Sequence, residues 1–152
     1  MGEKYYGGLD EAHLQDLARA LSKKLFPGAF LALFGDLGAG KTTFTQGLAH
    51  GLGILDIQSP TFTIVREHRE GTLPLFHFDA YRLSGADELY AIGFEDYLAQ
   101  DGVIVMEWCE NVPEALPVSR LDIRLTGSGS EPRVVVFCAR GPAYEALLEV
   151  LP

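Results

Sequence analysis

A glycine-rich segment in the first third of the chain has the residue types that bind nucleotide phosphates. From Gly35 to Thr42 it reads GDLGAGKT, which fits the pattern GxxxxGK[ST] at every fixed position. Glycines let successive backbone N–H groups face an anion, and Lys41 supplies a positive charge that reaches the β- and γ-phosphates. The Thr42 hydroxyl is a suitable ligand for Mg²⁺ bridging those phosphates. The segment predicts a site for a nucleoside triphosphate and Mg²⁺.

The whole loop and the start of the following helix are candidates for contacting the nucleotide, with Lys41 also a candidate catalytic residue. The candidate nucleotide-binding residues of this segment are Gly35, Asp36, Leu37, Gly38, Ala39, Gly40, Lys41, Thr42 and Thr43. A guanine-specific GTPase would usually carry an [NT]KxD element after a late strand. None of the four lysines of this chain has an aspartate two positions later, so the sequence favours ATP.

Two carboxylates follow apolar runs and are candidates for the Mg²⁺-dependent chemistry. Glu107 ends the run VIVME, and Asp79 ends the run LPLFHFD. Phosphoryl chemistry needs a carboxylate near the end of a buried strand beside the phosphate-binding loop, either to hold the metal or to orient an attacking water. A charged glutamate has little structural reason to end so apolar a strand, whereas an aspartate is also common in turns. The sequence does not rank the two for these roles.

Residues at four further places are weaker candidates. Thr61, in the segment SPTFT, lies where P-loop proteins place a threonine that senses the γ-phosphate. Trp108 follows Glu107 and is a core anchor, part of the site wall or part of a partner surface. His77 shares a strand face with Asp79, although a single histidine is more often structural. The segment 140–141 is a candidate contributor to the base pocket.

The elements that must position these residues follow from hydrophobic patterning. Residues 29–34 (AFLALF) form a continuous apolar run typical of a strand buried on both faces, and this run leads directly into the glycine-rich segment. A helix over 41–52 follows it. The other predicted elements are a helix over 9–25 with Asp10 as N-cap, a hairpin of strands 62–68 and 73–79, helices within 87–100 broken at Gly93, strands at 102–107, 121–126 and 133–139, and a helix from Pro142.

Composition supports one soluble domain. The chain has 152 residues, 47% of them hydrophobic and 22% charged, and no linker or repeat divides it. We predict a single P-loop ATPase domain over 1–152, of the α/β class. Its central sheet should be mixed, mainly parallel and flanked by helices, with one antiparallel hairpin.

Charge and targeting signals exclude several classes of protein. The net charge of −9 argues against binding nucleic acid through a basic surface of the chain's own. The two cysteines lack CxxC spacing, which argues against a zinc site. The N-terminus has no apolar signal region, and no apolar run approaches the roughly 18 residues of a membrane span. We therefore expect a cytoplasmic protein with no membrane partner.

Four motifs taken together resemble one known family. They are GDLGAGKTTF at 35–44, SPTF at 59–62, H-x-D-x-Y-R at 77–82, and the pair Glu107-Trp108. In this order and combination they are similar to the TsaE family, also called YjeE. The resemblance spans nearly the whole chain, and the combination is far more specific than the phosphate-binding loop alone.

The resemblance implies a bacterial cytoplasmic Mg²⁺-dependent ATPase that is weak alone and stimulated by partners. Such a protein acts with TsaB and TsaD in forming threonylcarbamoyladenosine at adenosine 37 of tRNA, and it meets tRNA only through the complex. Lys41 and Thr42 would correspond to phosphate and Mg²⁺ ligands, and Asp79 and Glu107 to the metal and catalytic carboxylates. Thr61 would be the switch residue, with Trp108 adjacent to the site.

Two other functions are compatible with the same motifs. A small P-loop kinase could phosphorylate a metabolite, but the arginines are scattered along the chain rather than clustered as in an arginine-rich lid. A nucleotide-gated binding module could use ATP to set a loop for partner docking without essential hydrolysis. The sequence does not separate this module from an ATPase.

Overall fold

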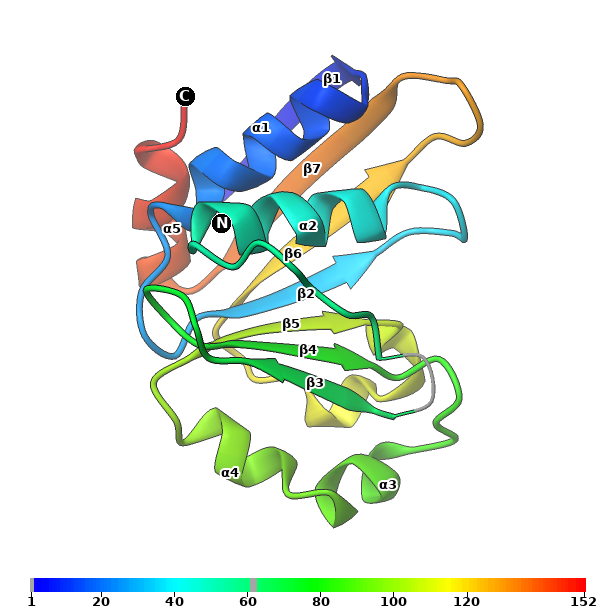
Figure 1. Ribbon diagram of the computed structural model, residues 1–152, viewed down its shortest axis with the longest axis vertical. Helices are drawn as coiled ribbons and strands as arrows, with labels where there is room; N and C mark the ends of the chain where they lie inside the picture. The colour runs from blue at the N-terminus through cyan, green and yellow to red at the C-terminus, as the bar shows by residue number, and fades with distance from the viewer. Residues whose placement is uncertain (1, 61–62) are drawn as a thin grey trace.

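One seven-stranded mixed sheet organises the part of the chain that the structure describes, residues 2–60 and 63–152 of a computed structural model (Figure 1). The strands lie in the order β1-β7-β6-β2-β5-β4-β3. Their bounds are β1 (Gly2–Leu9), β2 (Phe30–Phe34), β3 (Val65–His68), β4 (Leu75–Asp79), β5 (Val103–Glu107), β6 (Arg120–Thr126) and β7 (Arg133–Arg140). The α/β class and the mixed sheet are as predicted.

The four central strands are parallel, and this brings their carboxyl ends to one edge of the sheet. β2 pairs in parallel with β5 and β6, and β5 pairs in parallel with β4. The outer pairs β3–β4, β6–β7 and β1–β7 are antiparallel. In this register Glu107 lies opposite both Leu33 and Asp79. The predicted carboxylates therefore end strands on the same edge as the phosphate-binding loop.

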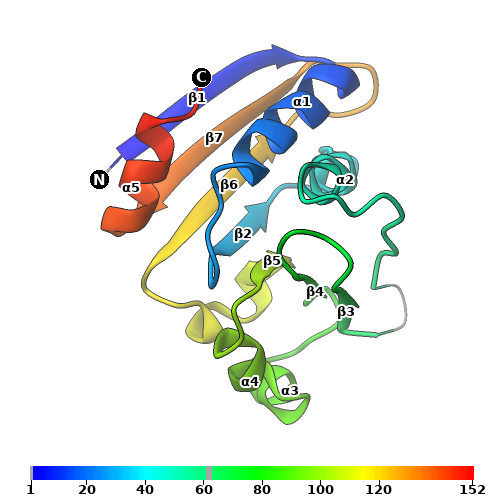
Figure 2. The same ribbon diagram turned by 60° about the vertical axis from the view of Figure 1, so that its left-hand side comes forward.

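Helices cover both faces of the sheet (Figure 2). α1 (Glu11–Ser22), α2 (Lys41–Gly51) and α5 (Pro142–Glu149) pack on one face, where they share a core with alternate residues of the central strands. On the other face lie α3 (Ala86–Ala91), α4 (Phe94–Leu98) and two short 3₁₀ turns over 109–111 and 113–115. Among the described residues, none of these helices is long and apolar enough to span a membrane.

The helix that follows the phosphate-binding loop is held close to α1. A Cβ at Gly47 of α2 would lie 2.6 Å from the Gln15 carbonyl oxygen and 2.8 Å from the Ala18 Cβ. Such distances are shorter than side chains tolerate, so glycine permits the two helices to approach this closely. The predicted cap of α1 is confirmed, because the Asp10 carboxylate accepts a hydrogen bond from the His13 backbone N–H. The packing of α1 on α2 fixes the orientation of α2, whose N-terminus faces the site.

One strand was missing from the sequence prediction. Residues before 9 were assigned no element, yet Gly2–Leu9 forms β1 and pairs antiparallel with β7. The segment contains three glycines and alternates half-buried with exposed residues, so its local pattern is weak. Pairing with β7 is what stabilises it as a strand, and that partner lies more than 120 residues away in the chain.

Candidate functional site

The phosphate-binding loop connects β2 to α2 and presents the N-terminus of α2. Gly38 and Gly40 adopt φ angles of 81° and 106°, a left-handed region that glycine occupies without strain. Gly40 is the N-cap of α2, and no side chain caps this helix. The first N–H groups of α2 are therefore available to an anion, and the helix dipole favours negative charge there. Lys41 is buried at the first position of α2.

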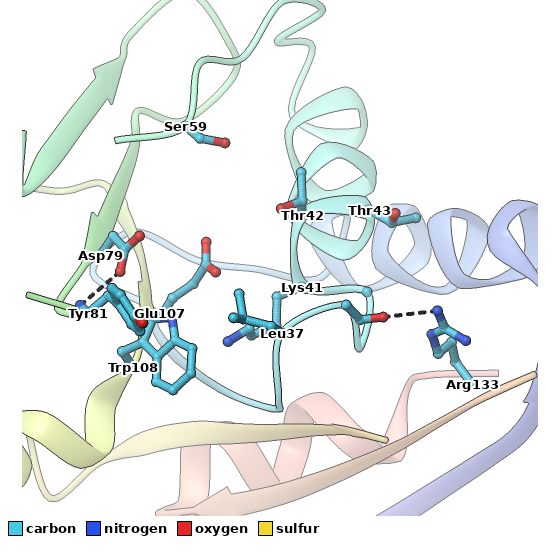
Figure 3. Close-up of a pocket in the computed structure, with 12 residues that line it drawn as sticks. Leu37, Lys41, Thr42, Thr43, Ser59, Asp79, Tyr81, Glu107, Trp108 and Arg133 are labelled. Carbon is cyan, nitrogen blue, oxygen red and sulfur yellow. Dashed lines mark hydrogen bonds between the residues drawn. The ribbon is translucent and has the colours of Figure 1, made fainter. Parts of the chain in front are cut away.

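A cavity of about 470 Å³ lies over this loop and collects most of the predicted residues (Figure 3). Its lining includes Leu37, Gly38, Gly40, Lys41, Thr42, Thr43, Asp79, Glu107 and Trp108, all of them candidates from the sequence, together with Ser59, Tyr81 and Arg133. Asp79, Glu107 and Trp108 lie on one side of the loop and Arg133 on the other (Figure 3). The two carboxylates and the Lys41 ammonium group beside Trp108 thus lie toward one end of the cavity, and the Arg133 guanidinium lies at the other.

Three predicted loop residues shape the loop without lining the cavity. The Ala39 N–H donates to the Asp36 carbonyl oxygen at 3.0 Å, and Ala39 itself is buried. A Cβ at Gly35 would lie 2.8 Å from the Leu125 carbonyl oxygen, so the chain leaves β2 in close contact with β6.

Thr61 lies outside the described residues, and its role therefore stays a prediction. The first residue of the strand predicted over 62–68 also lies outside them.

The two carboxylates lie side by side at the ends of β4 and β5. Asp79 Oδ1 accepts a hydrogen bond from the Tyr81 backbone N–H at 2.9 Å, which is the turn contact considered for this aspartate. Among the described residues, the second oxygen of Asp79 accepts no hydrogen bond, and the side chain lines the cavity. Burial raises the pKa of the Asp79 carboxyl, and the neighbouring Glu107 carboxylate raises it further. The hydrogen bond from the Tyr81 backbone N–H opposes the shift, and His77 and Lys41 oppose it to a smaller extent. Because two adjacent carboxylates repel each other, a cation bound between them would offset this repulsion and would itself be stabilised.

The donor set fits Mg²⁺. The Thr42 hydroxyl, Asp79 and Glu107 supply oxygen ligands, which Mg²⁺ prefers, and all three line the same cavity. Within residues 2–60 and 63–152, no group of three or more His, Cys, Asp or Glu side chains forms a metal cage. Mg²⁺ is usually held by one or two protein oxygens together with substrate phosphates and water.

The raised pKa of Asp79 predicts that Asp79→Asn stabilises the fold at neutral pH. Between the ordinary pKa of 3.8 and the raised value, the folded chain binds more protons than the unfolded chain, so stability falls as pH rises through this window. Above the folded-state pKa of Asp79, the cost of the ionised carboxylate is fully present. The asparagine carries no charge, and its carbonyl oxygen can still accept from Tyr81. We expect Asp79→Asn to raise Tm by about 1–3 °C at pH 7.

Thermal unfolding without nucleotide at pH 7 and at pH 4.5 measures this effect. The gain in Tm should shrink at the lower pH, where the folded wild-type carboxyl is increasingly protonated. The exposed Asp101→Asn is the matched control and should leave Tm unchanged at both pH values. A lower Tm for Asp79→Asn at pH 7 would mean that the fold stabilises the ionised carboxylate, contrary to the inferred shift.

Trp108 forms part of the site wall. Its backbone has φ 60°, unusual for a residue with a Cβ, and this places the indole over the loop. The Lys41 Nζ lies 4.0 Å from the centroid of the indole, and the Tyr81 ring packs against the indole with centroids 4.8 Å apart. Of the alternatives for Trp108, the structure places the side chain in the wall of the cavity and also packs it against the core on that side of the sheet, and a contact with a partner stays a prediction.

His77 contacts the site through Glu107. His77 Nε2 lies 2.6 Å from Glu107 Oε2, and both side chains are buried. The sequence had left open whether this histidine leans toward the site or serves the core. In the structure it lies beneath the carboxylate rather than in the cavity lining.

Arg133 is a site residue that the sequence analysis did not identify. At the start of β7, its Nε donates to the Ala39 carbonyl oxygen at 3.1 Å and its Nη2 to the Gly38 carbonyl oxygen at 3.0 Å. The segment 140–141, a candidate for the base pocket, lies at the other end of the same strand and does not line this cavity: Arg140 pairs with Arg120 and donates to Asp122. The start of β7 lies beside the loop because β6 is parallel to β2 and β7 is antiparallel to β6. Identifying Arg133 from the sequence would therefore have required these two strand pairings.

Arg133→Ala is expected to weaken ATP binding by about tenfold. The variant removes two charge-assisted hydrogen bonds that hold the loop carbonyls outward, and such bonds contribute on the order of 1.5–3 kcal/mol each when intact. Part of that loss is offset because water reaches this half-buried position. Titration with a fluorescent ATP analogue measures the dissociation constant. Arg66→Ala, at an exposed arginine of β3, is the control, and unchanged affinity for Arg133→Ala would show that the loop keeps its shape without these bonds.

A second cavity of about 450 Å³ adjoins the first on the side of Arg133. The two cavities share Gly40, Thr43 and Arg133. The second is otherwise lined by the segment 8–11, Leu14 and residues 129–132, so it lies between the start of α1 and the β6–β7 turn. Neither Asp79 nor Glu107 reaches it. A linear ligand along the loop could therefore occupy both cavities, with its ends in different surroundings.

Comparison with known proteins identifies the family. The family model for "Threonylcarbamoyl adenosine biosynthesis protein TsaE" matches residues 9–135. The chain is 48% identical over 126 residues to the tRNA threonylcarbamoyladenosine biosynthesis protein TsaE of Bacillus subtilis (strain 168), covering 82% of this chain and 78% of that protein. It is 46% identical over 117 residues to the protein of the same name from Streptomyces coelicolor, covering 74% and 78%.

A solved structure agrees with these matches. The crystal structure of Bacillus subtilis YdiB superposes on this chain with a TM-score of 0.86 and 38% sequence identity, covering 99% of this chain and 94% of that one. Sequence and fold therefore point to the same relatives over nearly the full length of the chain. On the family model, the identities and the shared fold, the chain belongs to the TsaE family.

Proposed function

We propose that this chain binds ATP with Mg²⁺, hydrolyses it weakly alone and faster with partners, and thereby supports threonylcarbamoyladenosine biosynthesis on tRNA. The observation that carries the proposal is the meeting of Lys41 and Thr42 with Asp79 and Glu107 in one cavity. The first pair suits the phosphates and the second pair suits the metal and an attacking water. The names of the related proteins supply the pathway.

The loop would bind the triphosphate through its backbone and Lys41. The uncapped N–H groups of α2 and the positive φ of Gly38 and Gly40 favour an anion at the helix start. Lys41 Nζ rests on the Trp108 face, a contact of about 0.5–2 kcal/mol, which the charge of the phosphates can outcompete. Binding would then move the ammonium group from the indole to the β- and γ-phosphates.

Hydrolysis would be carried by the acidic end of the cavity. Mg²⁺ supplies charge neutralisation between the β- and γ-phosphates when it is bound. The Thr42 hydroxyl and one of the two carboxylates would hold it, and the other carboxylate would accept a hydrogen bond from the attacking water and orient it in line with the γ-phosphate. Because Asp79 and Glu107 lie in register on adjacent strands, both are within reach of the γ-phosphate end.

The nucleoside would occupy the second cavity. Lys41 and Thr42 serve the β- and γ-phosphates, so the α-phosphate should lie toward Thr43, the next residue of the helix. Thr43 and Gly40 border both cavities. A triphosphate whose γ end faces Asp79 and Glu107 therefore directs its ribose and base toward the start of α1 and the β6–β7 turn.

Partners would supply the transfer chemistry and the contact with tRNA. The chain carries a net charge of −9, which disfavours direct binding to a polyanion. We propose TsaB and TsaD as the partners, on the family resemblance, with the chain acting in the cytoplasm. ATP hydrolysis by the docked chain would support repeated rounds of modification.

A reconstituted modification reaction tests this function. Purified TsaB and TsaD are supplied with threonylcarbamoyl-adenylate and unmodified tRNA, with and without this chain, and modified tRNA per TsaD is counted over time. We expect the yield to level off near one turnover without the chain and to continue rising when the chain, ATP and Mg²⁺ are present. A nonhydrolysable ATP analogue should return the reaction to a single turnover.

The same reaction separates the alternatives. Equal yields with and without the chain would contradict the proposed function. Transfer of phosphate to an added metabolite, followed with radiolabelled ATP, would instead support the P-loop kinase. Full turnover with the nonhydrolysable analogue would support a nucleotide-gated module.

A further inference from the structure

The buried His77 makes its polar contact with a site carboxylate. His77 Nε2 lies 2.6 Å from Glu107 Oε2, and the His77 side chain is 2% exposed. The two residues lie on adjacent parallel strands, where His77 is paired with Val105 and Asp79 with Glu107. His77 therefore lies one step down the same strand face as the two carboxylates, underneath them in the protein.

In the part of the chain that the structure describes, His77 forms no hydrogen bond other than the one with Glu107. Its neighbours on this face include Leu75, Val103 and Val105, which belong to the core between the sheet and the helices α1 and α2. His77 Nδ1 is buried and has no hydrogen-bond partner among the described residues. A histidine that served only the fold would usually satisfy both ring nitrogens or be replaced by an apolar residue. The imidazole is thus buried at a cost, and its hydrogen bond within residues 2–60 and 63–152 is with Glu107.

The contact fixes the direction of the hydrogen bond. A carboxylate accepts, so His77 Nε2 carries the hydrogen and donates it to Oε2. Nε2 is a donor in the neutral Nε2–H tautomer and in the imidazolium alike, so the arrangement does not depend on a change of protonation. The other oxygen of Glu107, Oε1, has no hydrogen-bond partner within the described ranges, and the side chain lines the cavity.

The two carboxylates are anchored in the same manner. Asp79 is held at Oδ1 by the Tyr81 backbone N–H, and Glu107 is held at Oε2 by His77. Glutamate has one more rotatable bond than aspartate and loses more conformational freedom when it is fixed. A long side chain at the end of a strand needs an anchor if its free oxygen is to meet a water or metal reproducibly.

We propose that His77 is a positioning residue, which through Nε2–H donation holds the Glu107 carboxylate in the orientation required for ATP hydrolysis. The inference rests on the proposed function, because it concerns the same cavity. His77 touches neither the phosphates nor the reacting atoms. Its effect is to limit the carboxylate to one orientation, so its loss should affect the chemical step more than nucleotide binding.

Paired substitutions distinguish positioning from packing. His77→Phe keeps a buried ring and removes the donor, whereas the side-chain amide of His77→Gln can place an N–H near the Nε2 position. We expect His77→Phe to lower kcat for partner-stimulated ATP hydrolysis by about 10- to 100-fold with KM within about twofold. His77→Gln should recover kcat to within about threefold of wild type. His68→Phe, at a buried histidine of β3 at the far end of the hairpin, is the matched control and should keep wild-type kcat.

A measurement without turnover tests the same contact. In ¹⁵N-labelled protein without nucleotide, the long-range ¹H–¹⁵N spectrum of the His77 ring should show a protonated Nε2. The glutamine of Glu107→Gln can offer either an N–H or a carbonyl to the ring, so the preference for the Nε2–H tautomer should weaken in that variant. Because the spectrum needs no ATP, it tests the proposal even where a ring substitution prevents folding.

The outcomes separate this inference from the proposed function. If the wild-type protein fails to hydrolyse ATP with its partners, the proposed function is contradicted. If the His77 spectrum of the same protein still shows Nε2–H and changes in Glu107→Gln, the contact between His77 and Glu107 remains supported. Wild-type hydrolysis with unchanged kcat in folded His77→Phe would overturn the positioning role. Equal losses of kcat in the Phe and Gln variants, with both folded, or a ring protonated at Nδ1 alone, would overturn it as well.

Discussion

Lys41→Ala is expected to lower the rate of ATP hydrolysis by about 100- to 1,000-fold, the range found when a preorganised charge or donor is removed from a reacting group. Lys41 is buried at the start of α2 with its ammonium group beside Trp108. A desolvated ammonium group interacts with phosphate charge more strongly than one in water. The other cation that lines this cavity is Arg133, whose guanidinium is occupied by the loop carbonyls.

Steady-state ATP hydrolysis in the presence of the partners measures the loss of rate in Lys41→Ala. Two controls are needed to interpret the result. Lys24→Ala, at an exposed lysine after α1, should hydrolyse ATP as wild type does. Thermal unfolding should show Lys41→Ala folded, since the variant loses an aliphatic stem and one cation–π contact rather than a core side chain. Wild-type rates in folded Lys41→Ala would exclude this cavity as the hydrolytic site.

Glu107→Gln is expected to reduce kcat by about 100- to 1,000-fold while the protein still binds ATP. The amide has the size of the carboxylate but neither its charge nor its basicity, so it can neither balance Mg²⁺ nor accept a proton from water. Phosphate binding relies on the loop and Lys41, which the substitution leaves in place. Single-turnover hydrolysis and titration with a fluorescent ATP analogue measure the two properties separately. Glu110→Gln, at an exposed glutamate of the following 3₁₀ turn, is the matched control.

The same variant distinguishes an ATPase from a nucleotide-gated module. Glu107→Gln in the reconstituted reaction should bind ATP yet give a single round of tRNA modification. Continued modification by a variant that no longer hydrolyses ATP would show that occupancy alone is sufficient, and the enzymatic interpretation would be wrong. If Glu107→Gln loses ATP binding as well as hydrolysis, the Glu107 side chain contributes to nucleotide binding rather than specifically to the chemical step.

The sequence by itself determined those features of this protein that depend on interactions between residues close together in the chain. The phosphate-binding loop needs glycines, a lysine and a hydroxyl at fixed spacing, because contiguous backbone N–H groups form the anion site. The buried strands 29–34 and 102–107 could be predicted because both faces of a central parallel strand are apolar. Asp10 could be predicted as the cap of the first helix because the N–H group that it accepts from is only three residues away. The family resemblance rested on the same short motifs.

Tertiary structure decided what depends on strand order and register. β1 is a strand because β7 is beside it, and its own glycine-rich pattern is too weak to show it. Arg133 reaches the loop because β7 runs antiparallel to β6, which in turn runs parallel to β2. The contact between His77 and Glu107 joins residues 30 apart in the chain and exists because β4 and β5 pair in one register. A shift of that register by one residue would direct the histidine to the opposite face of the sheet, so this contact is fixed by the packing of the whole sheet rather than by any short segment.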